Sequence, residues 1–511
     1  MRTHRAALLG ASWLAFAGAA WAQDPVEERL ERIAALEAHL AEIETQIGEL
    51  RERVAADATA EAARDAAASA NNTNANTTVQ VTLSNGRPTI TSADGQSRFA
   101  IRGQFQYDEA QYEQSGAPTP DNRRSDASNP GDLSAGANFR RARLGFDGAY
   151  RDWNYSLSFG LVGGGAGGED SQLAEAFIEY AGWKPFDDAA PVRLRIGAWG
   201  TPTGLDDATS NIETLFLERA AITELMRGIA GGDGRTGIGV FVNDQRWYGS
   251  FTLTGASIGN TGEFDEQSNY IARLALLPLH GEHYGLHTGV SAIGVANPAD
   301  TNSGTSITQT LRLRERSELR VDAQRFVDTG AIASDGLTAY GLELGGFWNN
   351  LYAAGEVFQI DLSRTDGLAD PRFSGWYVQG AWTLSGEQRR WNAANGGFQS
   401  VRPDRPFNVA SSDWGAWEIA ARYSVLTLNH NEGMLGHATP AGGVRGGEQT
   451  ITTIGLNWYP NNITRFLLDY QWVEIDRLDP ENNSIVTPAP GIGAQVGQGF
   501  EALSLRSQIA F

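Results

Sequence analysis

Residues 139–150 read FRRARLGFDGAY, and residues 152–161 continue as DWNYSLSFGL. Successive side chains of an extended strand point to opposite faces. In the first stretch Arg141 and Arg143 fall on one face. The apolar side chains of the other face are Ala142, Leu144, Phe146 and Tyr150. In the second stretch Trp, Tyr, Leu and Phe alternate with Asn, Ser and Gly. This period of two predicts β-strands with one apolar and one polar face.

The same alternation recurs from about residue 98 to the C-terminus, in segments separated by Gly, Asn, Asp or Pro. Clear examples are residues 98–110, 373–386, 416–426 and 452–475. Segments of about ten alternating residues predict an all-β fold, a transmembrane antiparallel β-barrel. A soluble β-sandwich also alternates, but a chain of this size would split into several domains. The final strand, LSLRSQIAF, ends in Phe511 and resembles the insertion signal of bacterial outer-membrane barrels.

The N-terminal part of the chain has a different composition. Residues 1–22 combine Arg2 and Arg5 with a short apolar run and an Ala-Trp-Ala site, which predicts a secretory signal peptide. Residues 23–56 predict a coiled-coil helix, because apolar residues recur at steps of three and four. The seam residues are Ile33, Leu36, Leu40, Ile43, Ile47, Leu50 and Val54. Residues 57–97 predict an Ala/Asn/Thr-rich linker, and residues 98–511 the barrel.

The charge pattern indicates which face meets water inside the barrel. The net charge is −21, yet the basic residues are arginines apart from Lys184. Arginine facing lipid at mid-bilayer costs about 2–4 kcal/mol, so the apolar face should meet lipid and the arginine face the lumen. Arginines assigned to the lumen include Arg102, Arg141, Arg143, Arg193, Arg195 and Arg273. Arg140 falls on the lipid face, at the strand start, where it could reach the headgroups or the rim.

Five stretches together resemble the phosphate-selective porins O and P of bacterial outer membranes. They are residues 138–159, 173–182, 195–219, 415–424 and 455–466. The resemblance implies a trimeric, sixteen-stranded barrel for small anions such as phosphate or polyphosphate. It also implies a long loop folded into the channel, here about residues 200–234. This loop carries Arg219 and Arg227 and ends next to Arg235.

The family's paired constriction arginines correspond to Arg140 and Arg141. A tyrosine of the family is replaced by Arg143, its constriction lysine falls at about Ile212, and its aspartate near Ala174. A further arginine falls near Gln104, with Arg102 two residues away on the same face. The resemblance therefore implies a basic lining that lacks parts of the specialised phosphate site.

Other functions receive less support. Gly255 to Gly259 fits a nucleophile-elbow pattern, but the sequence that follows does not predict the required strand-to-helix turn. No catalytic residue, cofactor or metal site is predicted. A weakly selective general porin remains an alternative, because Glu175 and Glu179 share the lumen face and could neutralise arginines. A barrel tethered to the cell wall through the coiled coil is another alternative. The expected partners are outer-membrane lipid, two further copies of the chain and peptidoglycan, with no nucleic acid; the N-terminal segment is expected in the periplasm.

Overall fold

The computed structural model describes two units of the chain. In the first unit, Met1–Thr77, the described residues are 31, 33–35, 37–49 and 51–53, and all of them are helical. In the second unit, Thr78–Phe511, they are 79–114, 133–161, 173–185, 190–258, 265–302, 307–480 and 491–511. Among these residues no helix combines the length and the apolar character needed to cross a membrane.

The helix agrees with the predicted helical periodicity. Of the predicted seam, Ile33, Leu40, Ile43 and Ile47 are described, and they are between 45% and 59% exposed. The pairing of this helix with other copies stays a prediction. The predicted signal peptide and most of the linker lie outside the described residues.

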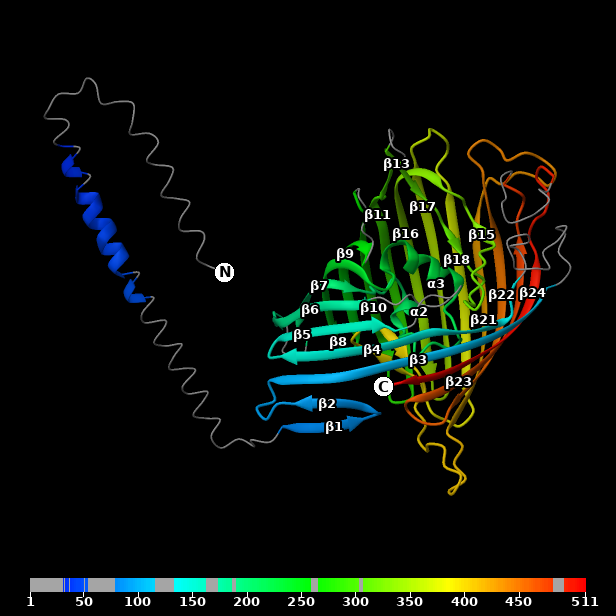
Figure 1. Ribbon diagram of the computed structural model, residues 1–511, viewed down its shortest axis with the longest axis horizontal. Helices are drawn as coiled ribbons and strands as arrows, with labels where there is room; N and C mark the ends of the chain where they lie inside the picture. Colours follow the sequence, from blue (N-terminus) through cyan, green and yellow to red (C-terminus); the bar gives the residue numbers. More distant parts are fainter. Residues whose placement is uncertain are drawn as a thin grey trace. The chain divides into compact units, whose positions relative to one another are not determined.

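Of the described strands, sixteen form a closed antiparallel barrel, because the last strand, β24, pairs with the first, β3. Figure 1 shows this ring of strands. Its members are β3 (Ser97–Gln114), β4 (Gly136–Tyr150), β5 (Trp153–Gly160), β6 (Leu173–Trp183), β7 (Val192–Trp199), β8 (Arg235–Asp244), β9 (Trp247–Ser257), β10 (Ser268–His280), β11 (Tyr284–Asn297), β16 (Ile332–Trp348), β17 (Leu351–Arg364), β18 (Arg372–Thr383), β21 (Ala416–His430), β22 (Val444–Tyr459), β23 (Thr464–Asp476) and β24 (Gly499–Ala510). The predicted barrel is confirmed.

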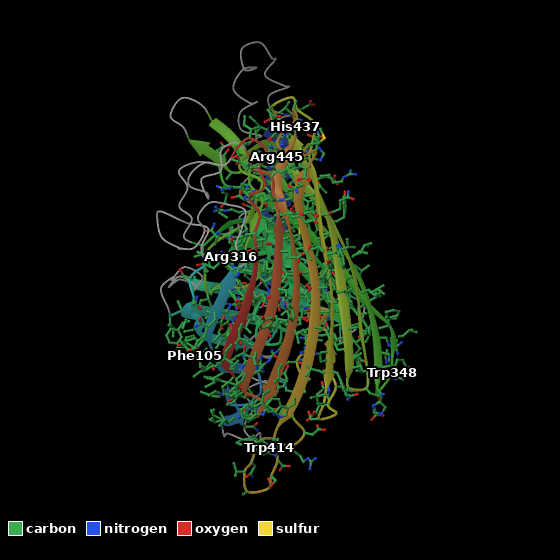
Figure 2. All side chains as sticks on the ribbon, turned by 90° about the vertical axis from the view of Figure 1, so that its right-hand side faces the viewer. Phe105, Arg316, Trp348, Trp414, His437 and Arg445 are labelled. Carbon is green, nitrogen blue, oxygen red and sulfur yellow. The ribbon has the colours of Figure 1, made fainter. Side chains whose placement is uncertain are left out.

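The strand alternation sorts side chains between two environments. The outward faces carry exposed apolar residues, as at Leu342, Leu344 and Val357, while their neighbours in sequence are buried. Aromatic residues lie near the strand ends, and Figure 2 shows Trp348 and Trp414 toward one end of the barrel and His437 and Arg445 toward the other. An apolar band bordered by aromatic side chains is the surface expected of a barrel in a membrane.

The two ends of the barrel differ in their connections. At one end most connections are tight, such as residues 151–152, 245–246 and 349–350 between successive strands. We call this the turn end, and the opposite end, with longer connections, the loop end. The C-terminal residue Phe511 lies at the turn end, where its backbone exchanges two hydrogen bonds of 3.0 Å with Gly103.

The main difference from the predicted boundaries lies before the barrel. Residues 80–91, expected in the linker, form a hairpin of β1 (Gln80–Ser84) and β2 (Arg87–Thr91). Strand β2 pairs with the start of β3, so the hairpin extends the sheet at the turn end. The Asn85-Gly86 turn has positive φ at both residues, as a tight hairpin requires.

Three connecting segments contribute many of the buried residues, and Figure 1 labels α2 (Leu205–Ala208) and α3 (Ala221–Met226) of the first of them. The first, residues 200–234 between β7 and β8, was predicted, and it contains α2, α3 and the π-helical turn η1 (Arg227–Gly231). The second, residues 312–331, contains β14 (Arg314–Glu315) and β15 (Val327–Asp328), and follows the loop strands β12 (Asp300–Asn302) and β13 (Ile307–Leu311). The third, residues 384–415, starts at the turn end and contains β19 (Arg390–Asn392) and β20 (Gly397–Gln399).

The third segment meets the first inside the barrel. Asn395 Nδ2 donates to the carbonyl of Ala208 over 2.8 Å, and the Phe398 ring packs against Tyr352 at 5.0 Å. The wall holds the segment through Arg273, which donates to the carbonyls of Asn395 and Gly396. These contacts hold the third segment against β10 and β17 of the wall.

Candidate functional site

A β-bulge turns both paired arginines toward the interior. In the β3–β4 ladder Gln106 lies opposite Arg141 and Tyr107 lies opposite Phe139, so Arg140 is an extra residue on β4. Arg140 is 6% exposed and Arg141 is 2% exposed. The alternation alone placed Arg140 on the lipid face, and this is wrong because the bulge shifts the alternation by one residue. Arg140 instead faces the interior, as its correspondence to a constriction arginine implied.

Glu218 of the first interior segment receives these arginine side chains. Arg140 Nε donates to Glu218 Oε1 over 2.6 Å, and Arg506 Nη2 donates to the same oxygen over 2.9 Å. Burial alone would raise the pKa of Glu218, but Arg140, Arg506 and Arg141 outweigh it and hold that pKa well below its usual value. Arg141 donates to Gln106 Oε1 over 3.0 Å, while its Nε has no hydrogen-bond partner.

A second cluster surrounds Arg227 at the start of η1. Its guanidinium forms ion pairs with Asp207, with Glu224 at 3.2 Å and with Asp233 at 2.6 Å. Asp233 also accepts from Arg143 Nη2 over 2.7 Å, so it joins the barrel wall to the interior segment. Burial raises the pKa of Glu224, but Arg227 and neighbouring arginines outweigh this effect and lower it to about 2.

Two cavities border this cluster. The loop-end cavity has a volume of about 440 Å³, and the turn-end cavity has a volume of about 250 Å³. Arg227 lines both of them. The charged residues of the loop-end cavity are Arg227, Arg312, Arg314, Arg320, Arg325, Glu224 and Glu315. Those of the turn-end cavity are Arg102, Arg143, Arg219, Arg227, Glu175, Asp207 and Asp233.

The loop-end cavity carries the larger excess of positive charge. Five arginines face two glutamates there, while four arginines face three carboxylates in the turn-end cavity. Arg316 lies beside the loop-end cluster, partway along the barrel in Figure 2. Burial, together with the positive charges of Arg320 and Arg325, lowers the pKa of Arg316 to about 10. Like charges are thus crowded at this position.

Ten arginines were predicted to face the solute, and the structure places them in different surroundings. Arg102, Arg143, Arg219 and Arg227 line at least one of the two cavities. The others, which line neither cavity, are Arg140, Arg141, Arg193, Arg195, Arg235 and Arg273. Arg273 lies in a fully buried pair with Glu343 Oε2 at 2.7 Å.

Three of these arginines lie against the wall or its loops. Arg193 donates to Asn243 Oδ1 over 2.7 Å. Arg195 pairs with Glu179 over 2.7 Å, and its guanidinium carbon lies 3.9 Å from the centre of the Phe177 ring. Arg235 donates to the carbonyls of Gly255 and Gly228. These contacts tie each of the three guanidinium groups to the wall or its loops.

Three of the four positions that depart from the family pattern line the turn-end cavity, namely Gln104, Arg143 and Ile212, whereas Ala174 does not. Gln104 Nε2 donates to Asn211 Oδ1 over 2.8 Å. Gln104 and Ile212 are uncharged at the two positions where the resemblance implied cations. Among the described residues no group of His, Cys, Asp and Glu is arranged to hold a metal ion.

The sequence did not predict the interior carboxylates, and it did not predict that the arginine run from Arg312 to Arg325 borders a cavity. The run of arginines from Arg312 to Arg325 was visible, but nothing placed it beside a cavity. The pairing of Asp233 with Arg143 and of Glu218 with Arg140 joins residues 78 or more positions apart, so no local pattern reveals it. A larger apolar hollow of about 990 Å³ lies on the outer face of β16–β18 and takes no part in these clusters.

Several known proteins are similar to this chain. Porin O of Pseudomonas aeruginosa is 25% identical over 407 residues, which are 77% of this chain and 86% of that protein. Among solved structures, OmpT of Vibrio cholerae has a TM-score of 0.45 and 10% identity, and covers 81% of this chain and 98% of its own. An anion-selective porin from Comamonas acidovorans has a TM-score of 0.43 and 11% identity, and covers 81% of this chain and 100% of its own.

The family model described as "Phosphate-selective porin O and P" matches residues 99–497, which is most of the barrel unit. The matched region contains both cavities except for the terminal residues of β24 and Phe511. The chain therefore belongs to the phosphate-selective porin O and P family and is an outer-membrane porin.

Proposed function

We propose that this porin is a passive channel that prefers anions, with phosphate or polyphosphate among the candidate solutes. The observation that carries the proposal is the loop-end cavity, where five arginines face two glutamates. Clustered arginines attract anions through their field and through their N–H donors. In an entrance enclosed by low-dielectric walls, this field raises the local anion concentration.

The proposed route runs from the loop-end cavity past Arg227 to the turn-end cavity. Arg102, Arg143, Arg219 and Arg227 are its arginines toward the turn end, joined by Arg312, Arg314, Arg320 and Arg325 toward the loop end. We assign Arg140 and Arg141 a supporting role in its field. Arg193, Arg195, Arg235 and Arg273 are left out, because each is bound to wall or loop groups.

The turn-end cavity favours a second candidate, a weakly selective porin. Its arginines exceed its carboxylates by only one, so its field is weaker than that of the loop-end cavity. Weak, successive sites let a solute leave as well as enter. Gln104 and Ile212 also argue against a tight phosphate site, since neither supplies a positive charge.

Bilayer electrophysiology separates the two candidates. The purified porin is placed in a planar bilayer with a potassium chloride gradient, and the reversal potential gives the permeability ratio. An anion-preferring pore gives a potential of the sign set by chloride, whereas a neutral or cation-preferring pore would contradict the proposal. Chloride conductance is then titrated with phosphate; block at low phosphate supports a phosphate site, and indifference supports a general pore.

The wall of the barrel supports a homotrimer. Strands β5 and β7 have 8 residues each, whereas β16 has 17 and β17 has 14. Eight tilted residues rise by about 20 Å, which is less than the apolar band of about 25 Å. We infer that this low wall packs against other copies. A single copy per particle in native mass spectrometry would contradict the inference.

The remaining topology follows the usual outer-membrane arrangement. Short connections lie in the periplasm and long loops outside, so we assign the turn end and the N-terminal helix to the periplasm. Contact with peptidoglycan stays a prediction from the sequence.

Protonation of Glu315 is expected to raise the anion preference of the pore when the pH falls below 7. Burial raises the pKa of Glu315 above its usual value, although Arg320 opposes this effect. As the pH falls from 7, Glu315 therefore takes up a proton while Glu224, with a pKa of about 2, stays ionised. The loop-end cavity loses one negative charge, so the reversal potential should move toward the anion limit.

The control is Glu315→Gln, which removes the same charge at every pH. This variant should show the increased anion preference already at pH 7, with little further rise on acidification. A variant that keeps the full wild-type response would show that another group causes it.

A further inference from the structure

The β1–β2 hairpin brings a charged side chain to the turn end of the pore. The backbone of β2 pairs with β3 through Thr89 opposite Ala100. The hairpin turn is anchored where Asn462 Nδ2 donates to Asn85 Oδ1 over 3.0 Å. From this position the guanidinium of Arg87 forms an ion pair with Asp147 of β4.

Arg87 is the first member of a row of alternating charges. Asp147 Oδ1 lies 3.5 Å from Arg102 Nε, and Arg102 Nη2 pairs with Glu175 Oε1 at 2.8 Å. Ser156 links the two acids, since its hydroxyl lies 2.7 Å from Asp147 Oδ1 and 2.6 Å from Glu175 Oε1. Gly145 makes room for the row, because a Cβ there would lie 2.6 Å from Arg102 Nε.

The row ends at the turn-end cavity, which Arg102 and Glu175 both line. Its four charged side chains are between 22% and 34% exposed, so water reaches them. Two arginines face two carboxylates, and the row as a whole is neutral. Without Arg87 the same place would carry one net negative charge beside a cavity whose own positive excess is a single charge.

We propose that Arg87 is a specificity-determining residue of the pore, which neutralises Asp147 and so prevents a cation-attracting exit from the turn-end cavity. The inference rests on the proposed anion preference and extends it to a residue outside the barrel strands. The hairpin thereby acts on ion selectivity through one side chain, besides extending the sheet.

The test compares reversal potentials of the full chain and of Arg87→Ala in planar bilayers. We expect the anion-to-cation permeability ratio to fall by roughly twofold or more at about 10 mM salt, where the Debye length is about 30 Å. At about 1 M salt, where it is about 3 Å, the difference should largely vanish. Arg87→Lys, which keeps the charge, should stay near the wild-type ratio.

A second variant separates charge from hairpin docking. Arg87→Ala combined with Asp147→Asn removes both members of the pair, so the ratio should return toward wild type even if the hairpin moves. The matched control is Arg151→Ala, because Arg151 is an exposed turn-end arginine that donates to Gln96 Oε1 at 2.8 Å and lies outside the row.

Three results would overturn the inference: an unchanged ratio in Arg87→Ala, no return in the double variant, or an equal fall in Arg151→Ala. Failure of the proposed function is a different result. It would appear in the wild-type reversal potential itself, whereas the role of Arg87 is read from the shift between wild type and variant.

Discussion

Replacing Arg227 with glutamine is expected to lower the anion-to-cation permeability ratio by roughly tenfold, the largest change from any single substitution along the route. Arg227 lines both cavities, so any solute that passes from one to the other meets its field. The substitution leaves Asp207, Glu224 and Asp233 without their shared partner. The turn-end cavity then loses its single excess positive charge, and the excess in the loop-end cavity falls from three positive charges to two.

The magnitude follows from the site's limited contact with water. A tenfold ratio corresponds to about 1.4 kcal/mol, well below the ~4 kcal/mol between unit charges 4 Å apart at an intermediate dielectric. Arg227 is 9% exposed, so solvent screens it less than a surface residue. Arg143 and Arg219 remain nearby, and they limit the change to less than a full reversal of the field.

The measurement is the reversal potential in a salt gradient, with circular dichroism as the check that the barrel has folded. Arg235→Gln is the matched control, because Arg235 belongs to the same part of the chain and, among the described residues, donates to backbone carbonyls and lines neither cavity. A folded Arg227→Gln variant with a ratio within twofold of wild type would show that the route does not pass this cluster.

The strands could be predicted because each has one face toward lipid and the other toward water along its whole length. The stretch 139–150 matches β4, Gly136–Tyr150, and the stretch 416–426 lies within β21, Ala416–His430. Every second residue is selected for contact with lipid, so the period of two survives along the chain. Strand number came from the family resemblance, since counting alternating segments does not distinguish a barrel strand from a short loop strand such as β13.

Local exceptions to the alternation were not predictable. The bulge at Arg140 is set by the pairing register of β3 and β4. The sequence around Arg140 also fits a regular strand without a bulge, so the pattern alone does not reveal it. The β1–β2 hairpin was assigned to a linker because its five-residue strands lack a buried face; all five residues of β1 are exposed. Its stability comes instead from pairing with β3.

The interior was predictable only in part, because its contacts join distant parts of the chain. The resemblance identified residues 200–234, but residues 384–415 start at the end where short turns were expected. Their anchors, such as Arg389 with Glu418 at 2.8 Å and Asn395 with Ala208, cannot be recognised from composition. Arg273 and Arg195 pair with wall carboxylates, while Arg227 and the loop-end arginines border the two cavities.

Removing the carboxylate of Glu218 is expected to destabilise the porin by about 3–5 kcal/mol, the usual cost of leaving a buried charge without its partner. Glu218 joins the interior segment to β4 through Arg140 and to β24 through Arg506. The side chains of Glu218 and Arg506 are 2% and 1% exposed. In Glu218→Ala, Arg506 keeps its bidentate bonds to Asp108, but Arg140 loses its ion-pair partner.

The measurement is the urea concentration at which tryptophan fluorescence reports unfolding from lipid vesicles. Glu109→Gln, which changes an exposed carboxylate of β3, serves as the control and should leave the midpoint unchanged. The double variant Glu218→Met with Arg140→Met should lose less stability than Glu218→Ala, since replacing both partners removes the unpaired charge. Equal losses would show that packing, rather than charge pairing, is what the substitution disturbs.

The pH dependence of this loss gives an independent reading. The folded-state pKa of Glu218 lies well below the ordinary value of 4.5, so its contribution to stability is fully present above pH 4.5 and declines as the pH falls toward the folded pKa. The difference in unfolding midpoint between wild type and Glu218→Ala should therefore be constant from pH 8 to about 5 and shrink in stronger acid. A difference that stays the same in acid would mean that the Glu218 carboxylate is not stabilised by its arginines. In that case apolar contacts would hold the interior segment in place. The charged side chains that line the two cavities would then be positioned by this packing rather than by ion pairs.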